Sequence, residues 1–203
     1  MKTYAPGGDP EVSLSRILLD DAWHREALEA LREVAPFAWI TGGFVRNAIW
    51  DATFGKRDFC TPADVDVIYL ETQRRSLLTE GGLGTALSRV APAVHWSVRD
   101  QGRMHMRSSD PPYQSVDEAL RAFPDRSSAI AVRLLPNGSL EILAPFGLED
   151  AFQGIVRPTP AGLSDGRFQR FLDRKLAGWR SRWPWLKIAS DSVQRRGSSR
   201  HAA

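Results

Sequence analysis

Two short motifs in the N-terminal half restrict what this chain can fold into. Residues 39–47 (WITGGFVRN) form an apolar run that ends in two glycines and opens a helical pattern. Residues 63–69 (ADVDVIY) form an apolar strand that begins with carboxylates. Glycine lets a backbone approach a ligand closely, and a helix N-terminus is electropositive, so the first motif suits a phosphate group.

The second motif suits a divalent cation. Side chains two residues apart in a strand share a face, so Asp64 and Asp66 are expected to project together. Proteins hold Mg²⁺ through one or two carboxylates, and substrate phosphates and water complete its shell. Glycines and aspartates are also common in ordinary turns, so neither motif alone is decisive. Together, in this order, they predict a nucleotide-phosphate site.

The combination resembles a known superfamily. Gly42-Gly43, a helix and then Asp64 and Asp66 on an apolar strand are similar to the nucleotidyltransferases that include DNA polymerase β, CCA-adding enzymes and antibiotic nucleotidyltransferases. Residues 42–47 resemble the Gly-Gly-x-Val-Arg-Asp opening of CCA-adding enzymes, with Asn47 in place of Asp. The interval from Gly43 to Asp64 is longer than usual, which indicates an inserted loop. The chain also resembles a little-characterised bacterial nucleotidyltransferase-like family at residues 41–47, 64–69, 103–105, 110–113 and 140–150.

The resemblance implies a fold and a reaction. The fold is a mixed α+β arrangement: a central mixed sheet flanked by helices, with N-terminal helices and a C-terminal packing helix. The reaction moves a nucleoside monophosphate from an NTP to a hydroxyl acceptor with release of pyrophosphate. Asp64 and Asp66 would bridge two Mg²⁺ ions, with Mn²⁺ as the alternative metal. Gly42 and Gly43 would hold phosphates, with Thr41 and Arg46 beside them.

A third carboxylate, Glu141, has two interpretations. It lies within the apolar run 140–144 (LEILA), where an unpaired carboxylate would be costly, so something should neutralise it. The resemblance implies a third metal ligand on a later strand, and Glu141 matches that pattern. A salt bridge to Arg133 on the preceding strand, or exposure at a sheet edge, explains the residue equally well.

Arg103 and His105 are further candidates for nucleotide binding. They share a face if residues 103–107 are extended, and a cation with an imidazole near the aspartates would bind phosphate or a second substrate. An ordinary surface strand is an equal alternative. Upstream, residues 94–98 (VHWSV) alternate like a strand, with His95 and Ser97 on one face.

The chain divides into three parts. Residues 1–12 predict a loose lead-in, residues 13–187 the nucleotidyltransferase-like domain, and residues 188–203 a disordered basic tail. Within the domain, Ser13 is expected to cap the first of the N-terminal helices, which end before Pro36. Residues 168–179 predict a packing helix with Lys and Arg on its outer face.

Composition limits the setting. No apolar run approaches the ~20 residues that cross a bilayer, no signal-peptide pattern opens the chain, and the single Cys60 cannot form an internal disulfide. We therefore expect a cytoplasmic protein without a membrane partner. Residues 165–203 carry ten Lys and Arg against three Asp. This excess indicates simple solvation, with a nucleic-acid-binding arm as the alternative.

The sequence does not fix the acceptor, which is RNA, protein or a small molecule. A non-catalytic nucleotide- or RNA-binding module with the same fold is the main alternative to an enzyme. A toxin-like or defence-linked transferase is a third hypothesis, which the sequence neither supports nor excludes.

Overall fold

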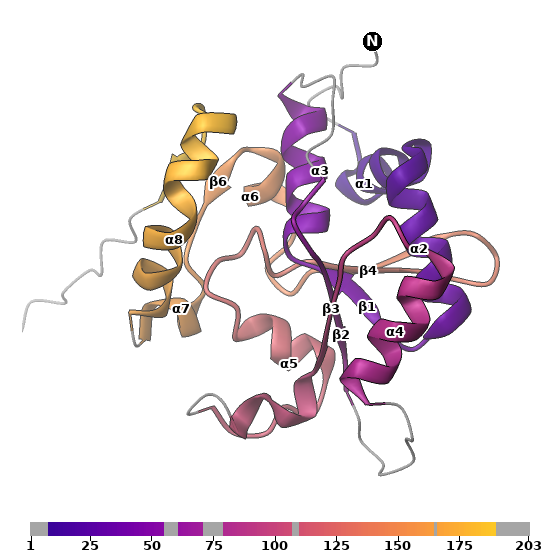
Figure 1. Ribbon diagram of the computed structural model, residues 1–203. Coiled ribbons are helices and arrows are strands. Elements are labelled where there is room, and N and C mark those ends of the chain that lie inside the picture. The colour runs from indigo at the N-terminus through magenta and orange to yellow at the C-terminus, as the bar shows by residue number, and fades with distance from the viewer. Residues whose placement is uncertain (1–7, 55–60, 71–78, 107–109, 165, 190–203) are drawn as a thin grey trace, which may run out of the picture.

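The computed structural model describes residues 8–54, 61–70, 79–106, 110–164 and 166–189 (Figure 1). The predicted tail beyond residue 189, Cys60 and the side chain of His105 lie outside this description. The α-helices are α1 Pro10–Asp20, α2 Ala22–Val34, α3 Gly43–Thr53, α4 Glu80–Val90, α5 Val116–Arg121, α6 Glu149–Phe152, α7 Pro160–Ser164 and α8 Arg167–Arg182, with a 3₁₀ helix η1 at Gln101–Met106. The strands are β1 Trp39–Thr41, β2 Val65–Tyr69, β3 Trp96–Asp100, β4 Ala131–Leu134, β5 Leu140–Leu143, β6 Ile155–Val156 and β7 Lys187–Ile188.

Five strands form a mixed central sheet in the order β3-β2-β1-β4-β5. The pair β2–β3 is parallel, and the other neighbours in this sheet are antiparallel. Helices pack around the sheet, as Figure 1 shows. This arrangement confirms the predicted mixed α+β fold.

The alternation of side chains along the strands divides the core into two parts. Ile40 and Val67 are cross-strand partners in the larger core, which α1, α2, α3 and α4 complete. Trp39 and Ile68 are cross-strand partners in a smaller cluster that includes Leu120 of α5. Asp66 lies two residues before Ile68 and therefore shares the face of the sheet that α5 partly covers.

The first helix begins earlier than we predicted. The Asp9 carboxylate caps α1 by accepting a hydrogen bond from the Glu11 N–H at 2.9 Å, and Pro10 is the first helical residue. Proline is favoured at this position because the first N–H of a helix has no partner within the helix. The prediction that Ser13 is the cap was therefore wrong, since Ser13 already lies within the first turn. Asp21 and Ser115 cap α2 and α5.

The C-terminal helix α8 packs against α3 through buried contacts. The Asp51 carboxylate on α3 is fully buried and accepts hydrogen bonds from Arg182 Nη2 at 3.0 Å and from Trp183 Nε1 at 2.7 Å. Beside it, the rings of Trp50 and Trp179 meet edge to face with centroids 5.1 Å apart. These contacts fix one side of α8 against the helix that follows the two glycines. No helix in the described segments is long and apolar enough to cross a membrane.

Candidate functional site

The two glycines form a sharp corner between β1 and α3. Gly42 has φ +68°, a conformation that side chains disfavour, and α3 begins at Gly43. A Cβ atom at Gly42 would lie 3.2 Å from Oδ2 of Asp66, which is closer than such contacts normally come. Glycine is therefore required here both for the turn and for the approach of the Asp66 carboxylate. The two motifs that the sequence singled out meet at this point.

The two aspartates lie around the start of β2. Asp66 is the cross-strand partner of Thr41, the last residue of β1, and Asp64 lies immediately before β2, close enough for its charge to act on Asp66. Asp66 is half-buried and Asp64 is exposed. Burial raises the pKa of Asp66, and the nearby charge of Asp64 raises this pKa further. A site that raises the pKa of one of two adjacent carboxylates favours a bound cation or a proton.

The neighbouring strand brings hydroxyl and imidazole groups rather than a further acid. Register pairs Ser97 of β3 with Asp66, and the Ser97 side chain forms a hydrogen bond with that carboxylate, which opposes the rise in its pKa. His95 comes immediately before β3 and its carbonyl accepts from the Val65 N–H at 2.7 Å. Ser97 therefore lies on the face that carries Asp66.

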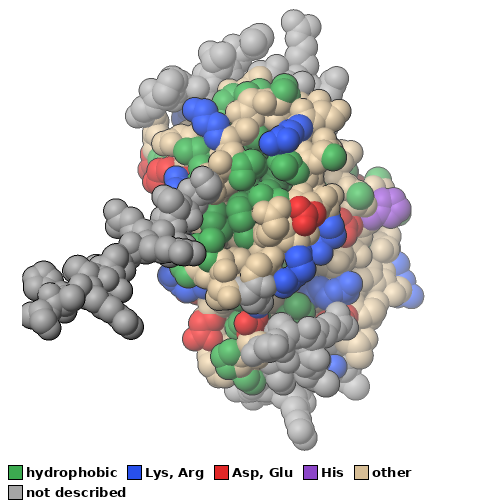
Figure 2. Space-filling model, turned by 90° about the vertical axis from the view of Figure 1, so that its left-hand side faces the viewer, with side chains coloured by type: hydrophobic (Ala, Val, Ile, Leu, Met, Phe, Trp, Pro, Cys, Tyr) green, Lys and Arg blue, Asp and Glu red, His purple; other side chains and the backbone are tan. Residues whose placement is uncertain are grey.

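A pocket of about 520 Å³ opens beside this corner. Gly42, Gly43, Asp64 and Asp66 form one wall, and α8 forms the opposite wall. The residues that α8 and the turn after it contribute are Phe171, Arg174, Lys175, Gly178, Trp179, Arg182 and Trp183. Figure 2 views the molecule from the side on which α8 lies and shows Lys and Arg side chains beside hydrophobic ones on this face.

Two exposed cations of α8 were not predicted as site residues. Arg174 and Lys175 line the pocket, and within the described residues neither takes part in an ion pair. Lys175 is close enough to Asp66 for its charge to oppose the rise in that pKa. From the sequence, we interpreted the basic side of this helix as solvated surface. Its position at the pocket depends on the docking of α8 through Asp51, and no local sequence pattern reveals that contact.

Arg46 lies at the bottom of the pocket but is well held by protein groups. Its guanidinium donates to Ser128 Oγ at 2.6 Å and to Asn47 Oδ1 at 2.9 and 3.2 Å, and it is 6% exposed. It also lies over the rings of Trp50 and Trp179, 5.0 and 4.5 Å from their centroids. Arg46 therefore joins α3 to α8 and leaves positive charge at the pocket floor. Asn47, where CCA-adding enzymes have Asp, accepts from this guanidinium.

Thr41 has a structural contact instead of a place in the pocket. Its side chain is fully buried, and Oγ1 donates to the Ile130 carbonyl at 2.7 Å. Thr41 thereby fixes the end of β1 to the segment before β4, immediately before the glycine corner. It is not among the residues that line the pocket.

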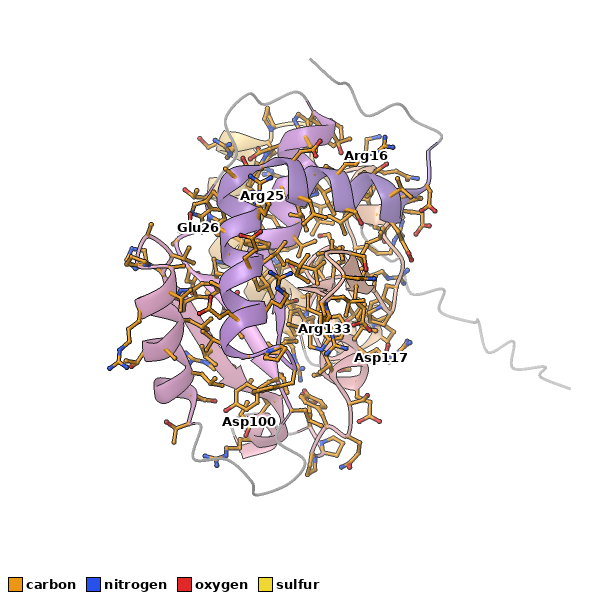
Figure 3. All side chains as sticks on the ribbon, turned by 90° about the vertical axis from the view of Figure 1, so that its right-hand side faces the viewer. Arg16, Arg25, Glu26, Asp100, Asp117 and Arg133 are labelled. Atoms are coloured by element: carbon orange, nitrogen blue, oxygen red, sulfur yellow. The ribbon has the colours of Figure 1, made fainter. Side chains whose placement is uncertain are left out.

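The structure does not bring Glu141 to the two aspartates. Glu141 lies on β5, and β4 and β1 separate that strand from β2. Its Oε2 accepts from Nε of Arg133, its partner on β4, at 2.6 Å. The Arg133 guanidinium in turn lies 4.3 Å from the centre of the Trp39 ring. The sequence left open whether Glu141 is a metal ligand or the partner of Arg133, and this contact is the salt bridge to Arg133. Figure 3 labels Arg133.

Arg103 also lies away from the pocket. It belongs to η1, which follows the far end of β3, whereas Ser97 and Asp66 pair near its beginning. Arg103 is 73% exposed at its side chain, and its Nε lies 3.3 Å from Oδ2 of Asp100. Figure 3 shows Asp100 at the lower end of the molecule. The backbone of His105 belongs to η1, so the segment 101–106 is helical, and the extended conformation that a shared face of Arg103 and His105 required is not present.

The two aspartates fit a divalent cation. Two neighbouring carboxylates, one of them with a raised pKa, supply the hard oxygen ligands that Mg²⁺ takes from proteins. Within the described segments, no group of three or more His, Cys, Asp or Glu side chains gathers as a metal site. Among the described residues, the groups at this corner that could hold such a cation are therefore the carboxylates of Asp64 and Asp66.

Comparison with solved structures places the fold among nucleotidyl-transferring enzymes. An NMR structure described as a CCA-adding enzyme head domain matches with a TM-score of 0.74 and 26% identity, over 88% of this chain and 95% of that one. Structures of CCA-adding enzyme with CTP and with ATP match with TM-scores of 0.55 and 0.57, at 14% and 16% identity over 87% of this chain. The chain spans 43% of the length of those enzymes. No curated protein matches.

The comparison with protein families agrees with the fold. A family model described as nucleotidyltransferase matches residues 33–188. The match begins before β1 and continues through α8, so it includes the glycine corner, both aspartates and the opposite wall of the pocket. The chain belongs to the nucleotidyltransferase family.

Proposed function

We propose that this protein transfers a nucleoside monophosphate from an NTP to a hydroxyl acceptor, with the chemistry at the corner of Gly42, Asp64 and Asp66. Membership in the nucleotidyltransferase family supports NTP-using nucleotidyl transfer in general. The observation that carries the residue assignment is the approach of Asp66 to Gly42, where a Cβ atom would come within 3.2 Å of the carboxylate. A phosphate at the glycine corner would thus lie beside an acidic group.

Positive charge around the pocket suits a triphosphate. The backbone N–H groups of the first turn of α3 have no partners within the helix and favour anions. Arg174 and Lys175 line the opposite wall, and Arg46 lies at the bottom. Phosphates between these groups would be attracted from both sides, while the aspartates face the same space.

In this proposal Asp64 and Asp66 hold Mg²⁺, or Mn²⁺ in its place. The cation, when bound, would neutralise charge on the phosphates and act as a Lewis acid. The raised pKa of Asp66 supports this role, because its ionised form lacks sufficient compensation from the protein alone. Glu141 is left out of this metal site because of its contact with Arg133.

The reaction would proceed by in-line displacement. The acceptor oxygen forms a bond to the α-phosphorus and loses its proton, while the bond from that phosphorus to the bridging oxygen of the β-phosphate breaks. Pyrophosphate leaves with the electron pair. The protein's contribution is to hold the triphosphate between the glycine corner and the α8 cations so that the α-phosphate lies next to the two aspartates. The acceptor class is RNA, protein or a small molecule.

Nucleotide binding without transfer is the second candidate. The cross-strand partner of Asp66 on β3 favours this candidate, because that residue is Ser97 and not a further carboxylate. A site with two acids would still bind a nucleotide with its cation, and the loss of transfer would leave a binding module.

The test combines a binding and a transfer assay. Calorimetric titration with each of the four NTPs in Mg²⁺ is compared between the wild-type protein and the variants Asp64→Ala and Asp66→Ala. The same proteins are incubated with NTPs that carry a labelled α-phosphate, together with cellular RNA, protein or metabolite pools. Incorporation of label identifies the acceptor class.

The proposal requires that the wild-type protein binds at least one NTP in a Mg²⁺-dependent manner and incorporates label, and that both variants lose these activities while they remain folded. Binding without incorporation supports the module. Unchanged titrations in well-folded Asp64→Ala and Asp66→Ala proteins would refute the residue assignment.

A further inference from the structure

The face of α8 that lines the pocket carries a regular stripe. Phe171, Lys175, Gly178 and Arg182 follow one another at intervals of four, three and four residues, and all four line the pocket. This spacing places them on one side of a helix. The stripe therefore presents an aromatic ring, a cation, a gap and a second cation to the pocket.

The gap at Gly178 has no explanation within the protein. Glycine is less favourable than alanine at an interior helix position, and Gly178 lies well inside α8. Its φ is not positive, so its backbone conformation is open to other residues. A Cβ atom at Gly178 would meet nothing within 4 Å among the described residues, so none of these neighbours excludes a side chain. The backbone of Gly178 is therefore open to the pocket that it lines.

The chemistry of the gap suits a flat aromatic group better than a phosphate. The N–H groups of interior helix residues are used within the helix, and glycine brings no side-chain donor, so the gap has nothing with which to bind a phosphate oxygen. On one side of the gap, the exposed Lys175 presents an alkyl stem, which packs well on the face of a π-system. On the other side, the Arg182 guanidinium is held by Asp51, so this residue borders the gap with its end fixed. Phe171 lies farther along the same stripe and is half-buried.

The gap and the glycine corner belong to one pocket. Gly42, Gly43, Asp64 and Asp66 line it together with Gly178. A nucleoside triphosphate whose phosphates lie at the corner would extend its base toward α8.

We propose that Gly178 is a specificity-determining residue whose missing side chain leaves room for the nucleobase of the bound NTP. This inference rests on the proposed function, since it presupposes that the pocket binds an NTP. Its content is that the base lies against α8 at Gly178, while the charge of Lys175 faces the phosphates, and that any side chain at residue 178 restricts the base.

The experiment measures binding of Mg²⁺-ATP, Mg²⁺-CTP and Mg²⁺-tripolyphosphate to the wild-type protein and to Gly178→Ala and Gly178→Leu. Tripolyphosphate has the phosphates of an NTP but no nucleoside. We expect Gly178→Leu to weaken ATP binding by about 10-fold or more, the usual effect of an ill-fitting group in a pocket. CTP binding should fall less because its ring is smaller, and tripolyphosphate binding should stay within about twofold.

Two control variants separate this effect from changes in the helix. Ala177→Leu adds the same side chain to α8 at an exposed residue that does not line the pocket, and it should bind ATP normally. Gly84→Ala changes an interior glycine of α4, where a Cβ would make only an ordinary contact at 3.8 Å. Gly84→Ala and Gly178→Ala should both raise the melting temperature, but only Gly178→Ala should weaken ATP binding.

The outcomes distinguish this inference from the proposed function. A wild-type protein that binds no NTP would overturn both. A wild-type protein that binds ATP, with a folded Gly178→Leu variant that binds it equally well, would overturn the role of Gly178 alone. A parallel loss of ATP and tripolyphosphate binding in Gly178→Leu would also overturn it, because the gap would then serve the phosphates.

Discussion

Two strands of the same sheet carry carboxylates on the same face, and the two sites differ in what surrounds them. At β2, Asp66 faces a pocket with Asp64 beside it, and neither forms an ion pair within the described residues. At β5, Glu141 is neutralised by Arg133 at 2.6 Å, and Arg133 is itself stacked on Trp39. The comparison teaches that an acid within an apolar strand does not by itself indicate a metal ligand. The decisive feature is whether the protein already supplies the compensating cation.

The largest expected difference is in nucleotide transfer. Asp66→Asn should reduce transfer by at least about 100-fold, because it removes a metal ligand and the charge that holds the cation. Glu141→Gln should leave transfer within about twofold, because its carboxylate is paired elsewhere. Initial rates of label incorporation at saturating Mg²⁺-NTP measure both variants.

A strong loss of transfer in Glu141→Gln, with an unchanged melting temperature, would break the comparison. It would mean that β5 moves toward β2 when substrate binds. An active Asp66→Asn protein would have the opposite meaning, since the acids of β2 would then be no more functional than the acid of β5.

The next effect concerns the cations that face the β2 acids. Arg174→Gln and Lys175→Gln should each weaken Mg²⁺-NTP binding by about 10-fold, which corresponds to ~1.4 kcal/mol and is close to the lower end of the range for hydrogen bonds to charged groups. The double variant should also show a weaker dependence of the dissociation constant on salt. Arg180→Gln, an exposed change on the same helix outside the pocket, is the matched control. Equal affinities in all these variants would remove α8 from the phosphate site.

The sequence alone predicted the aspartates of β2 and the glycine corner, because each of these features depends on residues that are close along the chain. Alternation along one strand puts Asp64 and Asp66 together, and a corner of two glycines before a helix is legible within a few residues. Glu141 required the strand order, which depends on pairings between distant segments. The spacing of its apolar neighbours is the same whether β5 lies beside β2 or is separated from it by β1 and β4. The sequence therefore left two interpretations where the structure has one contact.

The sequence could not predict that α8 forms the opposite wall of the pocket, for the same reason. Residues 168–179 were predicted as a packing helix, and α8 at Arg167–Arg182 confirms the helix. Its docking depends on the buried Asp51, whose partners Arg182 and Trp183 are far away along the chain. Lys175, Gly178 and Arg182 have helical spacing, but only the docked helix shows that they line the same pocket as Asp66.

A smaller effect concerns stability and pH in the absence of metal. The pKa of Asp66 is raised in the folded protein, so the folded state holds the Asp66 proton more tightly than the unfolded state does. The favourable contribution is complete below the unfolded pKa of ~3.9 and is lost as pH rises through the folded pKa. Asp66→Asn cannot ionise. In EDTA at neutral pH it should therefore melt higher than the wild-type protein, by about 2–4 °C for each kcal/mol of relief.

Mg²⁺ sharpens this measurement. The cation should raise the melting temperature of the wild-type protein at neutral pH and leave that of Asp66→Asn nearly unchanged, since a ligand stabilises only the protein that binds it. Melting curves from pH 4 to pH 8, with Mg²⁺ and with EDTA, record both effects. If the wild-type protein in EDTA is the more stable one at neutral pH, Asp66 is already compensated, as Glu141 is.

The smallest effect belongs to β5. Glu141 and Arg133 are 39% and 27% exposed at their side chains, so water screens their attraction, and Glu141→Gln should cost no more than about 1 kcal/mol. Arg133→Gln should cost more, because it also removes the packing of the guanidinium on Trp39 and leaves the Glu141 charge without its partner. Chemical denaturation of both single variants and the double variant gives the coupling energy of the pair. A coupling near zero would show that Glu141 needs no partner at this edge, and the absence of an ion pair at Asp64 and Asp66 would then lose its value as a sign of function.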